Sequence, residues 1–309
     1  MKKKECVSMK PFTSCLALLF GVSALSTSAI FVKLANAPSA ITALYRLFFA
    51  WLILLPAVLL QRERRAEFRH LSKRQWGLSI LSGILLAIHY ILWFESLNYT
   101  SVASSTVIVT LQPIFTILLG YFFLGERQNW IAGIGCLIAI AGSILIGYGD
   151  FQIGAQALIG DLMALLAAAL ISGYFFIGQL TRKNTSASLY SVLGYGSSVV
   201  FLAIYALIQG NSFFAYSAST WKSFFGLAFV STVLGQFVFN LLLKGLPATT
   251  ISMSILGEPV GTCILAYFIL QERISFRQGI GMLVILGGLA LYFLSVPIQN
   301  QIHKKFSKT

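Results

Sequence analysis

Residues 111–127 read LQPIFTILLGYFFLGER, and residues 257–273 read GEPVGTCILAYFILQER. Each stretch sets a polar residue and a proline before an apolar run and ends on the same Glu-Arg pair. The two copies are 146 residues apart in the sequence. The same offset relates three glycines in each copy, which are Gly133, Gly135 and Gly142 in the first and Gly279, Gly281 and Gly288 in the second. The chain is therefore predicted to contain an internal duplication.

The composition around these copies indicates a membrane protein. Hydrophobic residues make up 57% of the 309 residues and charged residues only 10%, which is too little charge to cover a soluble domain. The net charge of +13 is spread over short segments between apolar runs, so it predicts no nucleic-acid partner. The four cysteines form no CxxC pair, and neither a disulfide framework, a metal site nor a cofactor is expected. No catalytic motif is recognised, and an enzyme is not expected.

A membrane-spanning helix needs about 20 apolar residues. Ten segments meet this requirement, which predicts an all-α integral membrane protein in contact with the lipid bilayer. The first is longer than the apolar core of a signal peptide and is expected to be retained. The predicted spans are residues 13–33, 40–60, 77–97, 103–123, 130–148, 158–180, 189–208, 223–243, 249–270 and 277–297. They divide into two five-helix repeats, 12–148 and 154–297.

The basic residues predict the orientation of the chain. With the N-terminus inside, 17 of the 22 Lys and Arg residues fall on the cytoplasmic side and 4 on the other, while Arg46 lies within a helix. This bias predicts that both termini are cytoplasmic. Because each half has an odd number of helices, the second half is expected to be inverted relative to the first. Inverted repeats are typical of secondary transporters.

The two copies resemble the drug/metabolite transporter superfamily, EamA type. The resemblance rests on the quoted stretches, on the paired glycines, and on Lys33 and the sequence RLFFA at 46–50, and it covers about residues 12–297. Gln271 departs from the pattern, because the first copy has Gly125 there. The resemblance implies a carrier of small solutes and favours export over import, since members include exporters of amino acids and other metabolites.

Two polar residues are expected at mid-depth in the membrane. Glu258 lies about 14 Å into its span, and its repeat mate Gln112 lies at a similar depth from the other side. Each precedes a proline, Pro259 or Pro113, which is expected to kink the helix and free a backbone carbonyl. The hypothesis is that Glu258 binds a substrate cation or a coupling proton. The alternative is that it only holds the kink.

Further polar residues are candidates for the wall of a substrate cavity. His89 and Trp93 are four residues apart and share a helix face, with Tyr90 beside it; Gln236 and Asn240 share a face in the same way. The alternative is interhelical hydrogen bonding that only holds the bundle together.

A gating ion pair is also predicted. Arg46 is expected to contact an anionic group, with Glu95 as the candidate, or to extend its side chain toward the membrane surface. The family resemblance adds Lys33 as a further gating candidate.

These observations predict a secondary active transporter of small metabolites in a bacterial inner membrane that works by alternating access. No ATP-binding motif is present, so a proton, a sodium ion or the solute gradient is expected to drive transport. An importer of the same superfamily and, less favoured, an intramembrane enzyme are the alternatives. The sequence leaves open whether the protein is a monomer or a dimer.

Overall fold

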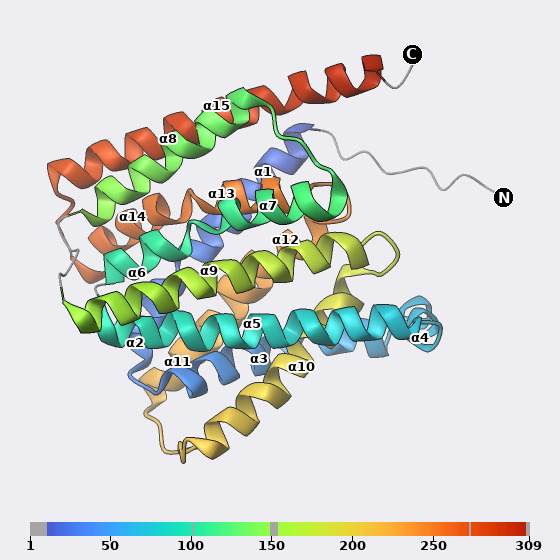
Figure 1. Cartoon of the computed structure of the whole chain (residues 1–309). Helices are drawn as coiled ribbons and strands as arrows, with labels where there is room; N and C mark the ends of the chain where they lie inside the picture. Colours follow the sequence, from blue (N-terminus) through green and yellow to red (C-terminus); the bar gives the residue numbers. More distant parts are fainter. Residues whose placement is uncertain (1–10, 101, 149–153, 272, 307–309) are drawn as a thin grey trace.

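The computed structural model describes residues 11–100, 102–148, 154–271 and 273–306, and these residues are almost entirely helical (Figure 1). Cys6, Glu272 and the lysines before residue 11 lie outside the described residues. The helices are α1 (Pro11–Ser26), α2 (Ser28–Ala35), α3 (Ser39–Leu59), α4 (Arg62–Arg69), α5 (Lys73–Tyr99), α6 (Val102–Val109), α7 (Gln112–Leu124), α8 (Trp130–Gly147), α9 (Ala155–Thr181), α10 (Ala187–Ile208), α11 (Ala218–Gly226), η1 (Leu227–Gln236), α12 (Phe237–Leu242), α13 (Ala248–Ile255), α14 (Glu258–Leu270) and α15 (Phe276–Phe306).

Ten candidate membrane spans are present among these residues, which confirms the predicted number. They are Thr13–Ala35, Ser39–Leu59, Lys73–Tyr99, Ser104–Leu124, Trp130–Gly147, Ala155–Thr181, Ala187–Ile208, Ala218–Leu242, Ala248–Leu270 and Phe276–Ser295. The chain is thus a multi-pass integral membrane protein. Four spans are interrupted, because each of them contains more than one helix. These spans contain α1 with α2, α6 with α7, α13 with α14, and α11 with η1 and α12.

The eighth span begins at Ala218 rather than at 223, which is the largest boundary difference. A difference of four residues concerns the connector at 61–76. The third span begins at Lys73 rather than at 77, because Ser72 caps the helix and Gln75 returns a hydrogen bond to the Ser72 backbone. The first turn of this helix is polar, so hydropathy alone places the start of the span several residues too late. The same connector also contains the short helix α4, which the sequence analysis did not predict.

The last helices of the two repeats, α8 and α15, pack closely and run antiparallel (Figure 1). A Cβ atom added to Gly135 would lie 2.7 Å from the carbonyl oxygen of Gly288, and one added to Gly281 would lie 2.8 Å from that of Gly142. Only glycine allows so close an approach of two backbones. The four glycines are the repeat-related pairs of the sequence, so the duplication defines this interface.

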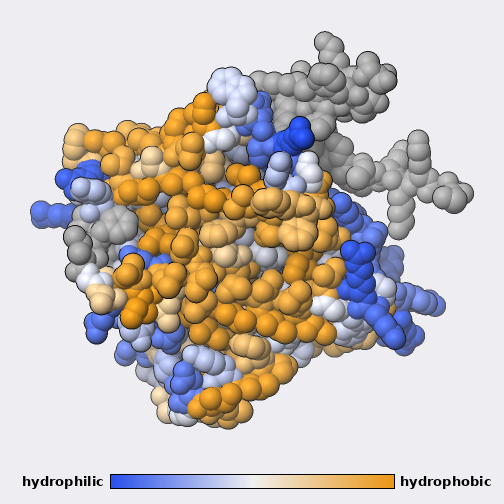
Figure 2. Space-filling view, viewed as in Figure 1, coloured by the Kyte–Doolittle hydropathy of each residue, from blue (hydrophilic) through white to orange (hydrophobic). Residues whose placement is uncertain are grey.

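The surface has an apolar band between two polar ends (Figure 2). The described chain begins and ends at the same end of the bundle as α4, on the right in Figure 1. Many apolar side chains on the band are exposed, including Leu137 (66%) and Leu283 (72%). Such exposure fits contact with lipid acyl chains.

Candidate functional site

The fourth and ninth spans are each broken at the residues predicted to lie at mid-depth. Helix α7 begins at Gln112 and α14 begins at Glu258, so Pro113 and Pro259 occupy the first turn of a new helix. A proline is tolerated there because the first-turn N–H groups have no partner within the helix. The predicted kinks are therefore complete breaks, which bring two helix N-termini into the interior of the bundle.

The backbone at each break is held by a serine of the other repeat. Ser172 Oγ donates to the carbonyl oxygen of Gln112 at 2.8 Å, and Ser26 Oγ donates to that of Glu258 at 3.2 Å. The 146-residue offset relates Ser26 to Ser172 and Gln112 to Glu258. The two contacts are thus copies of one contact, which couples the halves to each other at the breaks.

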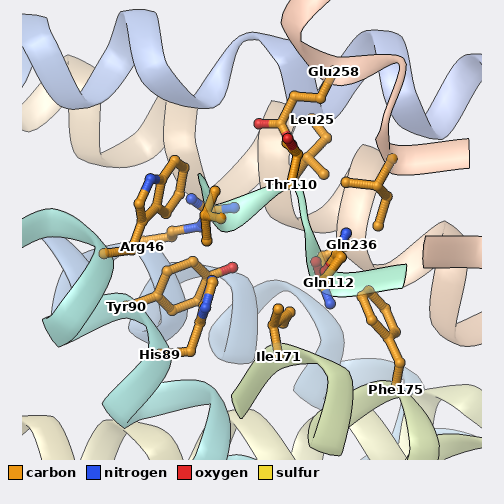
Figure 3. A pocket seen from close by; sticks show the side chains of 13 residues that line it. Leu25, Arg46, His89, Tyr90, Thr110, Gln112, Ile171, Phe175, Gln236 and Glu258 are labelled. Carbon is orange, nitrogen blue, oxygen red and sulfur yellow. The ribbon is translucent and has the colours of Figure 1, made fainter. Parts of the chain in front are cut away.

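A cavity of about 40 Å³ lies between the halves at this level (Figure 3). It has room for a few water molecules. Six of the predicted binding residues line it, together with the gating candidate Arg46, and these six are His89, Tyr90, Trp93, Gln112, Gln236 and Glu258. Aliphatic and aromatic side chains, among them Leu25, Ile171 and Phe175, complete the wall.

Arg46 of α3 is fully buried at the cavity. Its Nε donates to Thr232 Oγ1 at 2.9 Å and its Nη1 to Ser28 Oγ at 2.6 Å, while the guanidinium carbon lies 4.4 Å from the centre of the Tyr90 ring. These contacts fix the guanidinium in one orientation. Its Nη2 is buried and has no hydrogen-bond partner.

Two further donors at the cavity are buried without a partner, Trp93 Nε1 and Gln236 Nε2. A buried donor without an acceptor costs about 1–3 kcal/mol, and more when it is charged. With Arg46, three residues of the cavity wall therefore carry a buried donor without a hydrogen-bond partner. Among the described residues, Glu258 supplies the only acidic side chain of the cavity wall. The cavity is therefore suited to a polar molecule that brings hydrogen-bond acceptors.

Two neighbours hold the ring of His89 in place. Its Nδ1 lies 2.9 Å from the carbonyl oxygen of Ala167 on α9, and its ring stacks on Trp93 at 5.9 Å between centroids. Because a carbonyl oxygen can only accept, Nδ1 carries the hydrogen. In the neutral form of the ring, Nε2 is then the acceptor.

A wide helical turn supplies one residue that the sequence analysis did not identify, Thr232. Residues Leu227–Gln236 form a π-helix, in which Thr232 Oγ1 donates to the carbonyl oxygen of Leu227 five residues earlier. The same oxygen accepts from Arg46. The repeat mate of this segment lies in the regular helix α5, so the two halves differ here. No sequence signal marks the π-helix.

The structure corrects two predictions for this region. Asn240 does not line the cavity: its Nδ2 donates to Tyr174 Oη at 2.6 Å and to Ser191 Oγ at 2.9 Å, so it joins helices instead. The expected pair of Arg46 and Glu95 is not formed in the described part of the chain. Arg46 points into the bundle, whereas Glu95 is partly exposed and accepts from Asn98.

A second hollow, of about 260 Å³, lies next to the central cavity at the end opposite α4. Lys33, Asn36 and Asn98 contribute to its wall. Trp93 lines both spaces, so its indole separates the hollow from the cavity. The predicted gating residue Lys33 thus lies in a vestibule rather than beside Arg46.

At the α4 end the helices are tied together. Gln179 Nε2 donates to Glu126 Oε1, and Gln179 Oε1 accepts from the backbone N–H of Ala248, both at 2.7 Å. Arg182 is buried here and donates through Nε to the carbonyl oxygen of Asn240 at 2.7 Å. Burial lowers the pKa of the Arg182 guanidinium to about 10, and the nearby Glu67 carboxylate acts in the opposite direction. The sequence analysis counted Arg182 only as an orientation signal.

Comparison with known proteins identifies the fold. The model of the EamA-like transporter family matches residues 12–148 and again 158–294. The chain is 26% identical over 242 residues to the uncharacterized transporter sll1164 of Synechocystis sp., with 74% of this chain and 68% of that protein covered. It is also 26% identical to the uncharacterized transporter YwfM of Bacillus subtilis, with 79% and 81% covered. A crystal structure with 18% sequence identity superposes with a TM-score of 0.76 over 93% of this chain and 99% of that one. The chain belongs to the EamA-like transporter family.

Proposed function

We propose that this chain is a secondary active transporter that exports a small polar metabolite, such as an amino acid or a related solute, across the bacterial inner membrane. The observation that carries this proposal is the central cavity, where three of the lining residues have a buried donor without a partner and Glu258 lines the same wall. A solute with a carboxylate or carbonyl group satisfies the donors, and a cationic or donor group on the same solute pairs with Glu258. At about 40 Å³ the cavity is contracted compared with the roughly 300 Å³ of a small ligand pocket, so binding requires it to expand.

Alternating access follows from an inverted duplication. If the second repeat is inverted relative to the first, exchanging the conformations of the two halves opens the same cavity to the opposite side. The antiparallel contact of α8 with α15 and the matched serine contacts at the two breaks support this arrangement. The vestibule at one end and the Gln179 contacts at the other support a state that is closed toward α4.

The positive-inside rule assigns the α4 end, with both chain termini, to the cytoplasm. The closed end is then cytoplasmic and the vestibule faces outward. An exporter releases its solute through this vestibule, and an importer of the same family would receive it there. Everted membrane vesicles that accumulate the solute support export, whereas accumulation only in right-side-out vesicles supports import.

Glu258 is the proposed site for a coupling proton or for a cationic group of the solute. It is buried at the start of α14, and no ion-pair partner of its carboxylate is found among the described residues. A proton can satisfy a buried carboxylate when the solute is absent, and a positive group on the solute can replace it. Exchange of the two would couple transport to the proton gradient.

Solute counterflow in proteoliposomes tests the proposal. Labelled amino acids, nucleosides and polyamines are supplied in pools, and wild type is compared with Glu258→Gln. Glu95→Gln is the matched control, since Glu95 lies partly exposed outside the cavity. We expect saturable counterflow of one pool that falls at least tenfold in Glu258→Gln and is unchanged in the control. Equal counterflow in all three proteins would exclude Glu258 as the partner of the solute, and if Glu258→Gln also kept proton-driven accumulation, Glu258 would have no role in coupling. Unsaturable flux would indicate a channel.

A further inference from the structure

A groove that is larger than the central cavity and the vestibule opens toward the lipid at the α4 end of the bundle. It measures about 640 Å³ and lies between α3, α4, α5 and α10. Its walls are mainly apolar and include Trp51, Leu55, Trp76, Val192 and Val200. Val200 is 60% exposed. Because these helices span the membrane, such side chains face acyl chains rather than water.

Two arginines of α4 line the same groove, Arg65 and Arg69. Both are exposed, and neither has an ion-pair partner among the described residues. They are four residues apart and therefore lie on one face of the helix, with Phe68 beside them. In the described part of the chain, no acidic residue contributes to the groove wall. The apolar groove thus has a purely cationic end.

The acidic residues of α4 lie on its opposite face. Glu63 and Glu67 are about half a turn away from Arg65 in a regular helix. Glu67 pairs with Arg64 at 3.2 Å and accepts from the backbone N–H of Ser186 at the start of α10. Glu67 therefore fastens α4 to the start of α10, and neither acid lines the groove beside the two arginines.

Aromatic residues mark the depth of this cationic end. Phe68 and Trp76 both line the groove, and their rings meet edge to face at 5.2 Å between centroids. Tryptophan is enriched at the level of lipid headgroups, so Trp76 indicates the depth of the groove's cationic end. Figure 2 shows hydrophilic residues at this end beside the apolar band. Arg65 and Arg69 are thus positioned at the height of a phosphate group.

We propose that this groove binds one anionic phospholipid. An acyl chain lies along Leu55, Val192 and Val200, and the phosphate lies between Arg65 and Arg69. Guanidinium groups bind phosphate through paired hydrogen bonds. A lipid without net charge leaves the two positive charges unbalanced, and a soluble phosphate leaves the apolar groove unfilled. The site is separate from the central cavity, since the two share no lining residue.

Native mass spectrometry of the detergent-purified full chain tests the site. Phosphatidylglycerol and phosphatidylcholine with the same acyl chains are titrated separately, and retained lipid is counted. We expect saturable retention of one phosphatidylglycerol and weaker retention of phosphatidylcholine. Arg65→Gln with Arg69→Gln should weaken phosphatidylglycerol binding about 20- to 30-fold, because each basic residue contributes roughly a factor of five. Soluble glycerol phosphate should not displace the lipid at equal concentration.

Two further variants separate a built site from general surface charge. Arg62→Gln with Lys73→Gln removes the same charge at the same level without touching the groove, and should weaken binding less than threefold. Val200→Trp fills the groove from its exposed side and should weaken binding without changing charge. The proposal would be overturned if both double variants lost the same affinity for phosphatidylglycerol, or if the two lipids were retained equally. It would also be overturned if the wild-type protein were a dimer that Val200→Trp dissociates, because a second copy of the chain would then cover the groove. Solute counterflow in the same preparations reports separately on the transport site.

Discussion

Replacing Arg46 by lysine tests how the central cavity recognises its solute. Arg46 uses Nε and Nη1 to hold its own position on Thr232 and Ser28, which leaves Nη2 for a ligand. Lysine presents a single nitrogen, so positioning and solute binding compete for the same group. The lost contact is one hydrogen bond to a charged group, worth about 1.5–3 kcal/mol. This corresponds to a roughly 10- to 150-fold rise in the KM for the solute.

The assay is counterflow over a range of solute concentrations in proteoliposomes. Arg182→Lys is the matched control, because Arg182 is also a buried arginine that donates to backbone carbonyl groups but lies outside the cavity. We expect Arg182→Lys to lower thermal stability and to leave KM within about threefold of wild type, since it removes no ligand contact. A wild-type KM in Arg46→Lys would refute the role given to the free Nη2.

Three further sets of substitutions test the helix contact, the helix ends and the role of Asn240. Gly288→Ala should lower Tm, because overpacking against the backbone of α8 costs about 1–3 kcal/mol. Gly287→Ala is the control, since an added Cβ atom meets open space there and should leave Tm unchanged. Equal Tm values of the two variants would contradict the close contact of α8 with α15. Gln271 ends α14 in a left-handed conformation with φ 58°, which glycine adopts more easily, so Gln271→Gly should stabilise the protein by about 0.5–1 kcal/mol. Gly125 has φ 65°, so Gly125→Ala should destabilise the protein for the same reason. Unchanged stability of both variants in calorimetry would show that the backbone is not strained at these positions. Asn240→Leu should lose about 1–3 kcal/mol of stability with KM unchanged, and a raised KM would return this residue to the site.

The duplication was readable from the sequence because the same geometry imposes the same residues twice. A close helix contact needs glycine in both copies, and a helix that restarts in the membrane needs a proline in its first turn. Gln112 and Glu258 were therefore assigned to the central region, and the structure brings both to one cavity. Helical spacing also identified His89 and Trp93 as neighbours, and the two rings stack.

Helical spacing did not show how far the cavity extends along the eighth span. Gln236 and Asn240 do share a face, since both lie against Tyr174, but the cavity reaches Gln236 and not Asn240, which lies one turn farther along. Asn240 bonds to Tyr174 and Ser191 instead. Spacing also cannot tell which neighbour a charged residue meets. For this reason the partner of Arg46 was predicted to be an acid, whereas the structure supplies two hydroxyl groups.

Alternating access through the central cavity is tested most directly by locking the closed end. Cysteines replace Gln179 and Ala248, whose side chain and backbone N–H are in contact at 2.7 Å, in a chain without other cysteines. A short bifunctional methanethiosulfonate reagent joins them reversibly, and counterflow is measured before joining, after joining and after reduction. We expect joining to abolish counterflow and reduction to restore it, because the two helices must separate before the cavity opens at this end. Undiminished counterflow in fully joined protein would show that these helices need not separate, and would contradict transport by alternating access at this site.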